Sequence, residues 1–519
     1  MLAPNEKLAA SLKVLKSRQH DGRHVFASRE FSRVHRERLL RFGFLRRVIK
    51  GWLISSGPGT QDGDSTPWHA SYWEFCTRYC EERFNTAWHL SPAQSLLLHS
   101  DDTAIPAQVV VHSPKGANNK IDLPFGTSLY DLKERELPLE SEMTLRDGLR
   151  LYSQAAALVR VSGSFISRHP VEARVVLANI ADVGDILRGL LLGGHSVVAG
   201  RLAGAFRRIG REKDADEILN AMKAAGYEVR EEDPFRPDQP ITALTASPQP
   251  IVGRLQAMWD AMRGHVLESF PDPPGLPADH ESYLRAVNDI YQSDAYHSLS
   301  IEGYRVSPDL IECVASGNWN PEGSAADRAS RDALSAHGYW QAFQRVRRDI
   351  AQIIDGAEPA DLVRGSHREW YRELFEPCVA VGLIGAPALS GYRNDAVYLR
   401  TSRYVPPRWE AVSDAMATVF ELLRGEPEPS VKAVLGHWLL GYVHPYPDGN
   451  GRIARFLMNA MLASGGYPWT VIRIEDREPY LTALDSASVD QDIGPFARFV
   501  AERVRWSISA QSGVNRHRP

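Results

Sequence analysis

The chain has 519 residues, of which 43% are hydrophobic and 24% are charged, a composition typical of a globular protein with about three domains. No apolar run reaches the roughly eighteen residues that a membrane span needs, and the amino terminus lacks the apolar stretch of a signal peptide. We therefore expect a cytoplasmic protein with no membrane partner. Its four cysteines fit a reducing compartment, and Cys76 and Cys80 lack the second ligand pair of a zinc site.

The first fifty residues are strongly basic. They contain thirteen Lys and Arg residues against four acidic residues, a net charge of +9, whereas the whole chain carries −4. Residues 28–40 predict a short helical segment followed by an arginine-rich helix, and residues 42–54 predict a β-hairpin wing. This pattern resembles the winged helix-turn-helix of antitoxin-type regulators of the AbiEi group, which implies that DNA is a partner.

A winged helix bound to DNA would place its recognition helix in a groove and its wing on the flanking backbone, with a salt-dependent affinity. The predicted DNA-binding residues are Arg33, Arg36 and Arg38 on the helix and Arg46, Arg47 and Lys50 on the wing. Two alternatives stay open, because winged helices also dock proteins and a charge run is often only a solvated face. We assign residues 1–68 to this module. Residues 69–232 form a mixed α/β, helix-rich regulatory domain without catalytic spacing.

A proline-rich linker is predicted at residues 233–277, followed by a helical region at residues 278–362. In that region Leu284, Val287, Tyr291 and Ala295 have the spacing of an amphipathic helix. Gly303 is expected to be the residue just after this helix. Glu302 then lies in the last turn, where a negative charge opposes the helix dipole by about 0.3–1 kcal/mol. A residue that is unfavourable for its local structure, with nothing nearby in the sequence to compensate, often has a functional role.

Residues 390–399 and 404–407 predict a β-hairpin that precedes the most informative segment of the chain. That segment, residues 444–455, reads His-Pro-Tyr-Pro-Asp-Gly-Asn-Gly-Arg-Ile-Ala-Arg. Apolar residues after it recur with helical spacing, at Ile453, Phe456, Leu457, Ala460 and Met461, and the helical pattern before it stops at His444. The segment is therefore a loop that leads into a helix N-terminus. This arrangement is typical of a phosphate site, with His444 as a candidate base beside it.

Residues 444–455 resemble the signature of the Fic (Fido) family, except that Tyr446 stands where the family usually has Phe. The resemblance implies an all-helical core at residues 363–505 that transfers AMP from ATP to a Ser, Thr or Tyr hydroxyl of a protein. It makes His444 the general base and Asp448 the ligand of Mg²⁺, the implied cofactor. The implied nucleotide-binding residues are Gly449, Asn450, Gly451, Arg452, Arg455 and Tyr480.

Two further elements acquire a meaning from the same resemblance. The predicted hairpin would be a flap that binds the target segment as an added strand, with docking residues Gly391, Tyr392, Arg393 and Val397; a plain structural hairpin is the alternative. The string Ser298-x-x-x-Glu302-Gly303 matches the family's inhibitory motif. Glu302 would then pair with Arg455 and displace the phosphates of ATP, and Ser298 would hydrogen-bond the glutamate. In some relatives the same glutamate also supports removal of AMP.

The fold class that we predict is mainly α, with a Fic core and β-hairpin flap, an N-terminal winged helix-turn-helix and a helix-rich middle domain. The preferred function is a self-inhibited protein adenylyltransferase with a DNA-binding regulatory N-terminus. Its partners would be ATP, DNA and a protein substrate, which includes the chain itself, and a homodimer is one assembly that we consider. The alternative is a DNA-binding regulator, or a toxin-antitoxin component, whose Fic domain senses nucleotide or modifies only itself.

Overall fold

A computed structural model of the chain describes residues 4–61, 63–236, 241–242, 244, 247, 249–317 and 331–515. Parts of the predicted linker and of the predicted region 278–362 lie outside the described residues. The chain divides into two compact units. The amino-terminal unit comprises Met1–Gln239, Ala243–Pro250 and Tyr398–Val405, and the carboxy-terminal unit comprises Pro240–Thr242, Ile251–Val397 and Pro406–Pro519.

The first part of the amino-terminal unit combines two helices with a small antiparallel sheet. The helices are α1 (Pro4–Arg18) and α2 (Arg33–Arg41), and the strands β1 (Val25–Ala27), β2 (Leu45–Arg47) and β3 (Trp52–Ser55) pair in the order β1-β3-β2. Ser32 begins α2 by accepting a hydrogen bond from the backbone N–H of His35. A core of Leu15, Phe26, Phe31, Leu39, Leu45 and Leu53 joins the helices to the sheet. The predicted arginine-rich helix and the predicted hairpin both lie at their expected positions.

The middle of the amino-terminal unit contains a four-stranded sheet next to a long helix. The helix α3 (Thr66–Phe84) spans the boundary that was predicted between residues 68 and 69, and α4 (Pro92–His99) follows it. The sheet has the order β4-β5-β7-β6, and only β5 and β7 pair in parallel. Its strands are β4 (His89–Leu90), β5 (Gln108–Ser113), β6 (Asn119–Asp122) and β7 (Ser128–Lys133). A separate hairpin pairs β8 (Met143–Arg146) with β9 (Leu149–Tyr152).

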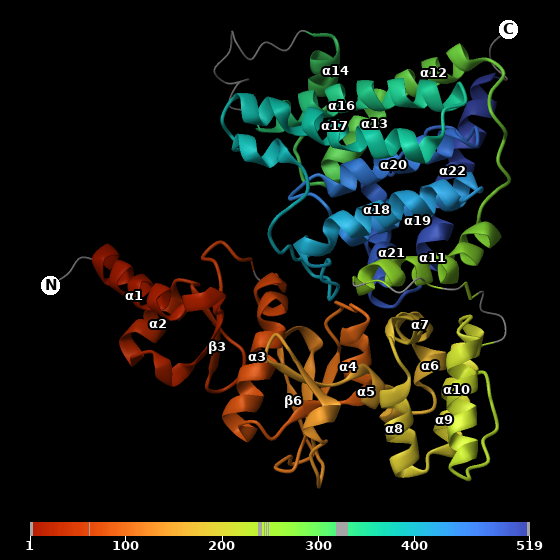
Figure 1. Cartoon of the computed structure of the whole chain (residues 1–519). Coiled ribbons are helices and arrows are strands. Elements are labelled where there is room, and N and C mark those ends of the chain that lie inside the picture. Colours follow the sequence, from red (N-terminus) through yellow and green to blue (C-terminus); the bar gives the residue numbers. More distant parts are fainter. Residues whose placement is uncertain are drawn as a thin grey trace. The chain divides into compact units, whose positions relative to one another are not determined.

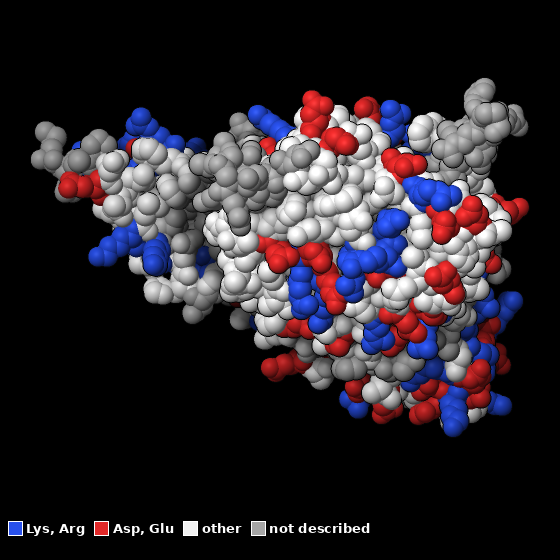
Figure 2. Space-filling model, turned by 90° about the horizontal axis from the view of Figure 1, so that it is seen from above, with Lys and Arg blue, Asp and Glu red and all other residues white. Residues whose placement is uncertain are grey.

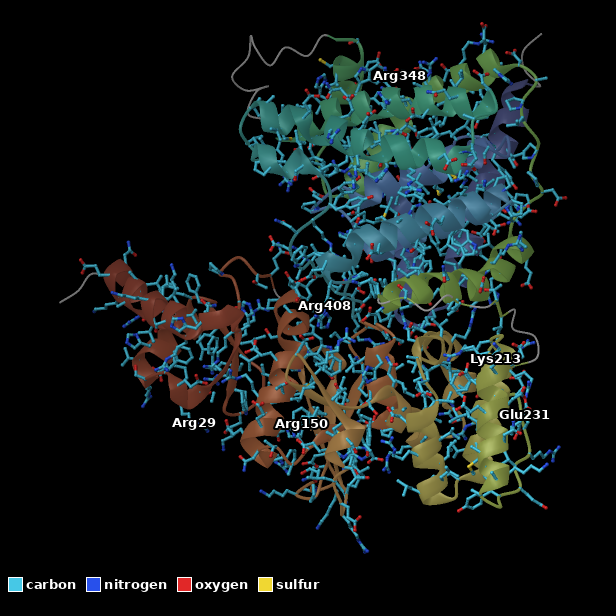
Figure 3. The ribbon with its side chains drawn as sticks, viewed as in Figure 1. Arg29, Arg150, Lys213, Glu231, Arg348 and Arg408 are labelled. Carbon is cyan, nitrogen blue, oxygen red and sulfur yellow. The ribbon has the colours of Figure 1, made fainter. Side chains whose placement is uncertain are left out.

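The amino-terminal unit ends in a group of helices. They are α5 (Gln154–Arg160), α6 (Phe165–Arg168), α7 (Pro170–Asn179), α8 (Gly184–Gly193), α9 (Ser196–Arg208) and α10 (Glu212–Ala224). On their surface Arg207 pairs with Asp216 at 2.7 Å and with Glu231 at 2.6 Å. The labelled Glu231 lies beside this group of helices (Figure 3). Residues 69–232 are therefore a mixed α/β region, in which α3 and α4 accompany the strands and the second half is all helical.

In the described residues of the carboxy-terminal unit, all regular secondary structure is helical (Figure 1). Its helices are α11 (Pro250–Ser269), α12 (His280–Asp289), α13 (Tyr291–Ile301), α14 (Pro308–Ala315), α16 (Arg331–Ile354), α17 (Pro359–Ala380), α18 (Val412–Gly425), α19 (Pro429–Val443), α20 (Asn450–Ala463), α21 (Arg477–Val489) and α22 (Gly494–Asn515). The helices α16 and α17 lie side by side, and both contact α20. The prediction of a mainly α fold is confirmed. Among the described residues, no helix is both long and apolar enough to cross a bilayer.

The helix α20 occupies the centre of the carboxy-terminal unit because almost its whole surface is buried. The apolar residues that predicted it are all buried: Ile453, Phe456, Leu457, Ala460 and Met461. The preceding helix α19 packs directly against it and ends at Val443, one residue before His444, as the sequence predicted. The single helix expected around Leu284–Ala295 is instead two helices, α12 and α13, which meet at Ile290.

Candidate active site

The turn between α19 and α20 carries the predicted phosphate-binding loop. His444 ends α19 in the left-handed conformation with φ 51°, and Gly449 precedes α20 with φ 80°. Asn450 fixes the turn, because its side chain accepts a hydrogen bond from the Tyr446 N–H at 2.9 Å and donates one to the Tyr446 carbonyl at 2.8 Å. Hydrogen bonds within the loop therefore fix its shape. The backbone N–H groups that follow it belong to the first turn of α20, where a helix binds anions.

Tyr446 is fully buried although it carries a hydroxyl group. Its ring stacks on Tyr371 with centroids 4.0 Å apart and an interplanar angle of 8°. The hydroxyl lies 3.5 Å from the carbonyl oxygen of His367, to which it donates a long hydrogen bond. Tyrosine is therefore accommodated at this position, with only a weak partner for its polar end.

His444 is placed to act as a base. Its Nδ1 lies 3.3 Å from the Gly441 carbonyl, which can only accept a hydrogen bond, so Nδ1 carries the proton and Nε2 presents a lone pair. Burial, assisted by the nearby charge of Arg393, lowers the pKa of His444 to about 4. The ring is therefore neutral at pH 7. A neutral imidazole in a half-buried position can accept a proton from a bound hydroxyl group.

Two glycines keep the loop open. A Cβ on Gly449 would lie 2.8 Å from Phe375 Cε2, and the positive φ there also disfavours any other residue. A Cβ on Gly451 would overlap with Oε1 of Glu302. The space above the first turn of α20 is therefore limited by one aromatic ring and one carboxylate.

The side chain of Arg452 lines this space. It is completely buried, between the rings of Tyr304 at 5.3 Å and Phe375 at 4.9 Å. Within the described part of the chain, its Nε–H has no hydrogen-bond partner. Its contact with a charged group is a 3.5 Å approach of Nη2 to Asp448. A buried guanidinium with an unused N–H favours an anionic ligand at this point.

Asp448 stands at the entrance of the loop. Its side chain is 52% exposed, and its Oδ1 accepts a hydrogen bond from the N–H of Gly449 at 2.6 Å. A single exposed carboxylate next to a phosphate site is the pattern in which Mg²⁺ is held by one protein ligand, phosphate oxygens and waters. The donor set therefore fits the implied cofactor.

Arg455 is bound by the predicted inhibitory residues. Its guanidinium group is buried. The Nε–H donates a hydrogen bond to Ser298 Oγ at 2.8 Å, and Nη2 donates to the Ser298 carbonyl at 3.1 Å and to Glu302 Oε1 at 2.7 Å. The predicted pairing of Glu302 with Arg455 is thus present in the structure. Ser298 differs from the prediction, because it binds the arginine from the other side and not the glutamate.

The end of α13 explains how Glu302 reaches Arg455. Gly303, with φ 88°, follows the helix, and the N–H groups of Gly303 and Tyr304 donate back to Ser300 and Leu299, which completes a Schellman cap. Burial alone would raise the pKa of Glu302, but Arg455 and Arg452 outweigh burial and hold this pKa below its usual range. The unfavourable charge seen in the sequence is therefore compensated by two arginines that come from α20.

The site also contains Tyr480, which the family resemblance predicted, and Tyr304, Phe375 and His437, which no sequence pattern identified. Tyr480, from α21, was predicted to line the nucleotide pocket; it is buried and shares a 2.7 Å hydrogen bond with Nε2 of His437. Burial, with a smaller effect of Arg455, lowers the pKa of His437 to about 3. Tyr304 and Phe375 form the walls around Arg452. Aromatic residues in helical patterns are usually core residues, so only the folded chain distinguishes these from the others.

The segments predicted to form the flap, residues 390–399 and 404–407, contain no β-strand. The hairpin prediction is therefore wrong at the level of secondary structure. Pro406 and Pro407 cannot donate ladder hydrogen bonds, and Arg393 holds the segment instead. Its side chain is buried and donates to the carbonyls of His444 at 2.8 Å and Asp395 at 2.9 Å, while its backbone N–H donates to Pro445 at 2.8 Å.

The other predicted docking residues are partly exposed. Tyr392 hydrogen-bonds His367 at 2.8 Å through its hydroxyl group, and Gly391 has a φ of 138°. Beyond Val397 the chain joins the amino-terminal unit, where the Ile105 N–H donates to the Arg403 carbonyl at 2.8 Å. Gly391, Tyr392 and Val397 are therefore partly open to solvent, whereas the Arg393 side chain is enclosed.

The six basic residues predicted to bind DNA divide into two groups. Arg36, Arg38 and Arg46 are partly buried and donate to backbone carbonyls, with Arg38 reaching Lys7 at 2.8 Å. The exposed members are Arg33, Arg47 and Lys50, and Arg33 forms an ion pair with Glu37 at 2.7 Å. Figure 2 shows basic side chains at the amino-terminal end of the chain, on the left of the view.

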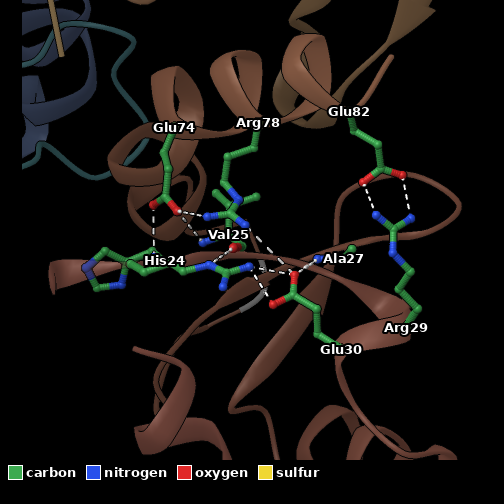
Figure 4. A network of polar contacts seen from close by, with 9 residues as sticks. His24, Val25, Ala27, Arg29, Glu30, Glu74, Arg78 and Glu82 are labelled. Atoms are coloured by element: carbon green, nitrogen blue, oxygen red, sulfur yellow. Dashed lines mark hydrogen bonds and ion pairs between the residues drawn. The ribbon is translucent and has the colours of Figure 1, made fainter. Parts of the chain in front are cut away.

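Hydrogen bonds and ion pairs with α3 hold the amino-terminal segment in place (Figure 4). Glu74 accepts hydrogen bonds from the backbone N–H groups of His24 at 2.9 Å and Val25 at 3.1 Å. Arg29 pairs with Glu82 through two hydrogen bonds, at 2.7 and 2.9 Å. Part of the positive charge counted in the sequence is therefore used to hold the fold together, and it is not offered to a ligand.

A cavity of about 380 Å³ lies elsewhere in the carboxy-terminal unit. It is lined by residues of α11 and α18 and the turn that follows α18, among them Trp259, Arg263 and Glu426. Glu426 is already bound to Arg263 at 2.8 and 2.9 Å. None of the lining residues belongs to the loop at 444–455, so the size of this cavity does not bear on the chemistry of the site.

Part of the chain is similar to known proteins. Residues 359–462 match the Fic/DOC family. The protein adenylyltransferase Fic of Nematostella vectensis is 30% identical over 239 residues, which are 45% of this chain and 52% of that protein. The protein adenylyltransferase fic-1 of Caenorhabditis elegans is 33% identical over 126 residues, 24% of each chain. The chain thus spans about half the length, or less, of the curated relatives that it matches.

Solved structures of similar proteins were also found. Residues 134–508 of Fic-1 from C. elegans align at 19% identity with a TM-score of 0.37, covering 66% of this chain and 99% of that chain. A Fic domain containing signaling protein from Bacteroides thetaiotaomicron aligns at 19% identity with a TM-score of 0.35, covering 50% of this chain and 94% of that chain.

Proposed function

The chain carries a Fic/DOC domain over residues 359–462, and from that premise we propose that it is a self-inhibited protein adenylyltransferase. Relatives named protein adenylyltransferase support the reaction class. The observation that carries the proposal is the contact of Arg455 with Glu302 and Ser298 beside an otherwise complete phosphate-binding loop. A base, an anion-binding helix terminus and a contested arginine all lie within residues 444–455.

The reaction follows from the placement of these groups. The oxygen of the target hydroxyl attacks the α-phosphorus of ATP, its proton moves to Nε2 of His444, and the bond to the pyrophosphate leaving group breaks. The amides at the start of α20 and the Arg452 guanidinium neutralise the developing phosphate charge. Asp448 would hold Mg²⁺, which supplies further positive charge to the phosphates. Residues 391–397 would position the target segment.

Inhibition follows from the use of Arg455. While its guanidinium is bound to Glu302 and Ser298, it is not available to the γ-phosphate. The carboxylate of Glu302 also occupies the space next to Gly451 and repels phosphate oxygens. ATP can then bind only with its α-phosphate displaced, and a displacement of about 1 Å can lower the rate on the order of 100-fold. Removal of AMP by the same site, with Glu302 orienting water, is part of the proposal.

A transfer assay with two labels tests the function. The full chain and a Glu302→Gly variant are incubated with a cell lysate and ATP that carries the label on either the α- or the γ-phosphate. We expect protein labelling from the α-label only, about 100-fold stronger in the variant. Labelling from the γ-label would indicate phosphate transfer. Absence of labelling by a Glu302→Gly variant that still binds ATP would contradict the proposal.

The matched control is Glu281→Gly. Glu281 is also a glutamate paired with an arginine, Arg285 at 3.4 Å, but its side chain is exposed on α12 and is not part of the loop at 444–455. We expect its substitution to leave the transfer rate unchanged. An equal gain from both substitutions would mean that general loosening of the unit, and not release of Arg455, raises the activity.

We propose in addition that the amino-terminal unit binds DNA, because the exposed Arg33, Arg47 and Lys50 project from a helix and a hairpin of the expected kind. The test is the salt dependence of binding to random-sequence duplex DNA, followed by selection of a preferred sequence. We expect the affinity to fall steeply as salt rises. Binding that does not respond to salt, or no binding at low salt, would leave a protein-docking module as the better explanation.

A further inference from the structure

Two histidines and a glutamate meet at one edge of the four-stranded sheet of the amino-terminal unit. His89 on β4 and His112 on β5 are direct register partners. Glu134 follows the last residue of β7, the parallel neighbour of β5, and its N–H donates to the Ser113 carbonyl at 3.1 Å. Three neighbouring strands thus bring three ligand-type side chains to one place.

We propose that His89, His112 and Glu134 form a binding site for a divalent transition-metal ion of the Zn²⁺ class. Oε2 of Glu134 lies 3.0 Å from Nε2 of His89 and 3.0 Å from Nδ1 of His112. The three ligand atoms all lie within 4.8 Å of one another, and no other such group occurs among the residues that the structure describes. Ligand atoms about 2.0–2.2 Å from a tetrahedral metal are roughly 3.3 Å apart, so only small adjustments are needed.

The orientation of the His89 ring supports this proposal. Its Nδ1 lies 3.0 Å from the Leu90 carbonyl, which can only accept, so Nδ1 carries a proton. In the neutral ring, Nε2 is then the nitrogen with the lone pair that a metal ion binds. This nitrogen is buried, has no hydrogen-bond partner among the described residues, and faces a carboxylate oxygen. Two lone pairs at this distance repel each other, and a cation between them removes the repulsion.

The surroundings match those of a protein metal ligand. A histidine that binds a metal through Nε2 usually donates its Nδ1–H to a backbone carbonyl or carboxylate, which fixes the ring. The Leu90 carbonyl has this role, and the Tyr152 ring packs edge-on against His89 with centroids 4.9 Å apart. The Glu134 side chain is 37% exposed, so the ion would be reachable from solvent and could keep a water as its fourth ligand.

A bound ion would also affect the stability of the amino-terminal unit. The ion would connect β4, β5 and the end of β7, and its binding free energy would add to the stability of the sheet. The cysteines do not take part, because Cys76 and Cys80 are buried in the apolar core around α3. A metal site in this unit therefore depends on histidine and glutamate only. Neither the Fic/DOC domain nor the proposed transfer reaction is needed for it.

The test uses the full chain after removal of metal by a chelator. We expect it to take up about one equivalent of Co²⁺ with the strong visible absorption of a four-coordinate site, and Zn²⁺ to displace this signal. His112→Ala and Glu134→Gln are the variants of choice, because both side chains are partly exposed and the fold should tolerate their loss. Each should weaken binding by more than about tenfold and abolish the rise in melting temperature that Zn²⁺ causes.

The matched control is His280→Ala. His280 pairs with Asp355 at 2.7 Å in the carboxy-terminal unit, but no third ligand accompanies this pair in the described residues. We expect this variant to bind Co²⁺ as the unchanged chain does. Failure of the unchanged chain to bind Co²⁺ or Zn²⁺, or uptake that persists in His112→Ala with circular dichroism unaltered, would overturn the proposal.

Discussion

Arg455 in the carboxy-terminal unit and Arg33 in the amino-terminal unit have opposite environments. Arg455 in the carboxy-terminal unit is 3% exposed and places three hydrogen bonds on Ser298 and Glu302. Arg33 in the amino-terminal unit has a side chain that is 82% exposed, with one ion pair to a neighbour on its own helix. Exposed pairs of this kind contribute little to stability, whereas loss of a partner from a buried charge has large effects. Burial of a charge therefore identifies the proposed regulatory contact in this chain better than the number of charges does.

The largest effect is expected from His444→Ala in a Glu302→Gly chain. Without the imidazole nothing accepts the proton of the target hydroxyl, so the transfer rate should fall on the order of 10²–10⁴-fold. The measurement is label transfer at saturating ATP, with ATP affinity determined separately by titration. A normal rate together with normal ATP affinity would mean that another group is the base.

Gly451→Ala tests whether the Glu302 carboxylate occupies the space that the phosphates of ATP need. The new methyl group would overlap with Oε1 of Glu302, which is the movable end of a side chain. We expect the carboxylate to be displaced and the transfer rate to rise about tenfold. In a Glu302→Gly chain the same substitution should bring no further gain. Equal gains in both backgrounds would contradict the contact as the cause.

Arg38→Ala and Arg47→Ala compare a structural arginine with an exposed one. Arg38 donates to the Lys7 carbonyl and to Ser11 Oγ on α1, so its loss should lower the free energy of unfolding by about 1 kcal/mol. Arg47 is exposed, and its loss should leave the melting temperature unchanged while reducing the salt slope of DNA binding by about one. If Arg47→Ala lowered the stability and Arg38→Ala lowered only the salt slope, our division of the basic residues would be wrong.

The smallest effect is expected from pH. His444 works as a base when it is deprotonated, and burial lowers its pKa to about 4. The transfer rate of the Glu302→Gly variant should therefore be constant above about pH 6 and should fall as the pH drops toward 4. Because the charge of Glu302 raises this pKa, its removal should shift the fall further to acid. A midpoint near the ordinary histidine value of about 6.5 would show that the ring is more solvated than the structure indicates.

Local sequence patterns predicted the elements around the site well. The end of α19, the start of α20, the glycine after α13 and the Arg-rich helix followed by a hairpin all depend on periodicity and caps within about ten residues. The expected flap strands failed because strand pairing is not local. Arg393 and the prolines at 406–407 bind or block the backbone groups that a ladder would have used.

The sequence by itself determined which groups are present for chemistry: a histidine, a carboxylate and two arginines spaced around a glycine-flanked helix start. The tertiary structure decided how they are used. Ser298 and Glu302 are more than 150 residues before Arg455, and only packing of α13 on the α20 region brings them to it. The enclosure that lowers the pKa of His444, and the pairing of strands that brings His89, His112 and Glu134 together, have the same origin. Burial and contact between distant segments change the energy of a charge, and no local pattern encodes that energy.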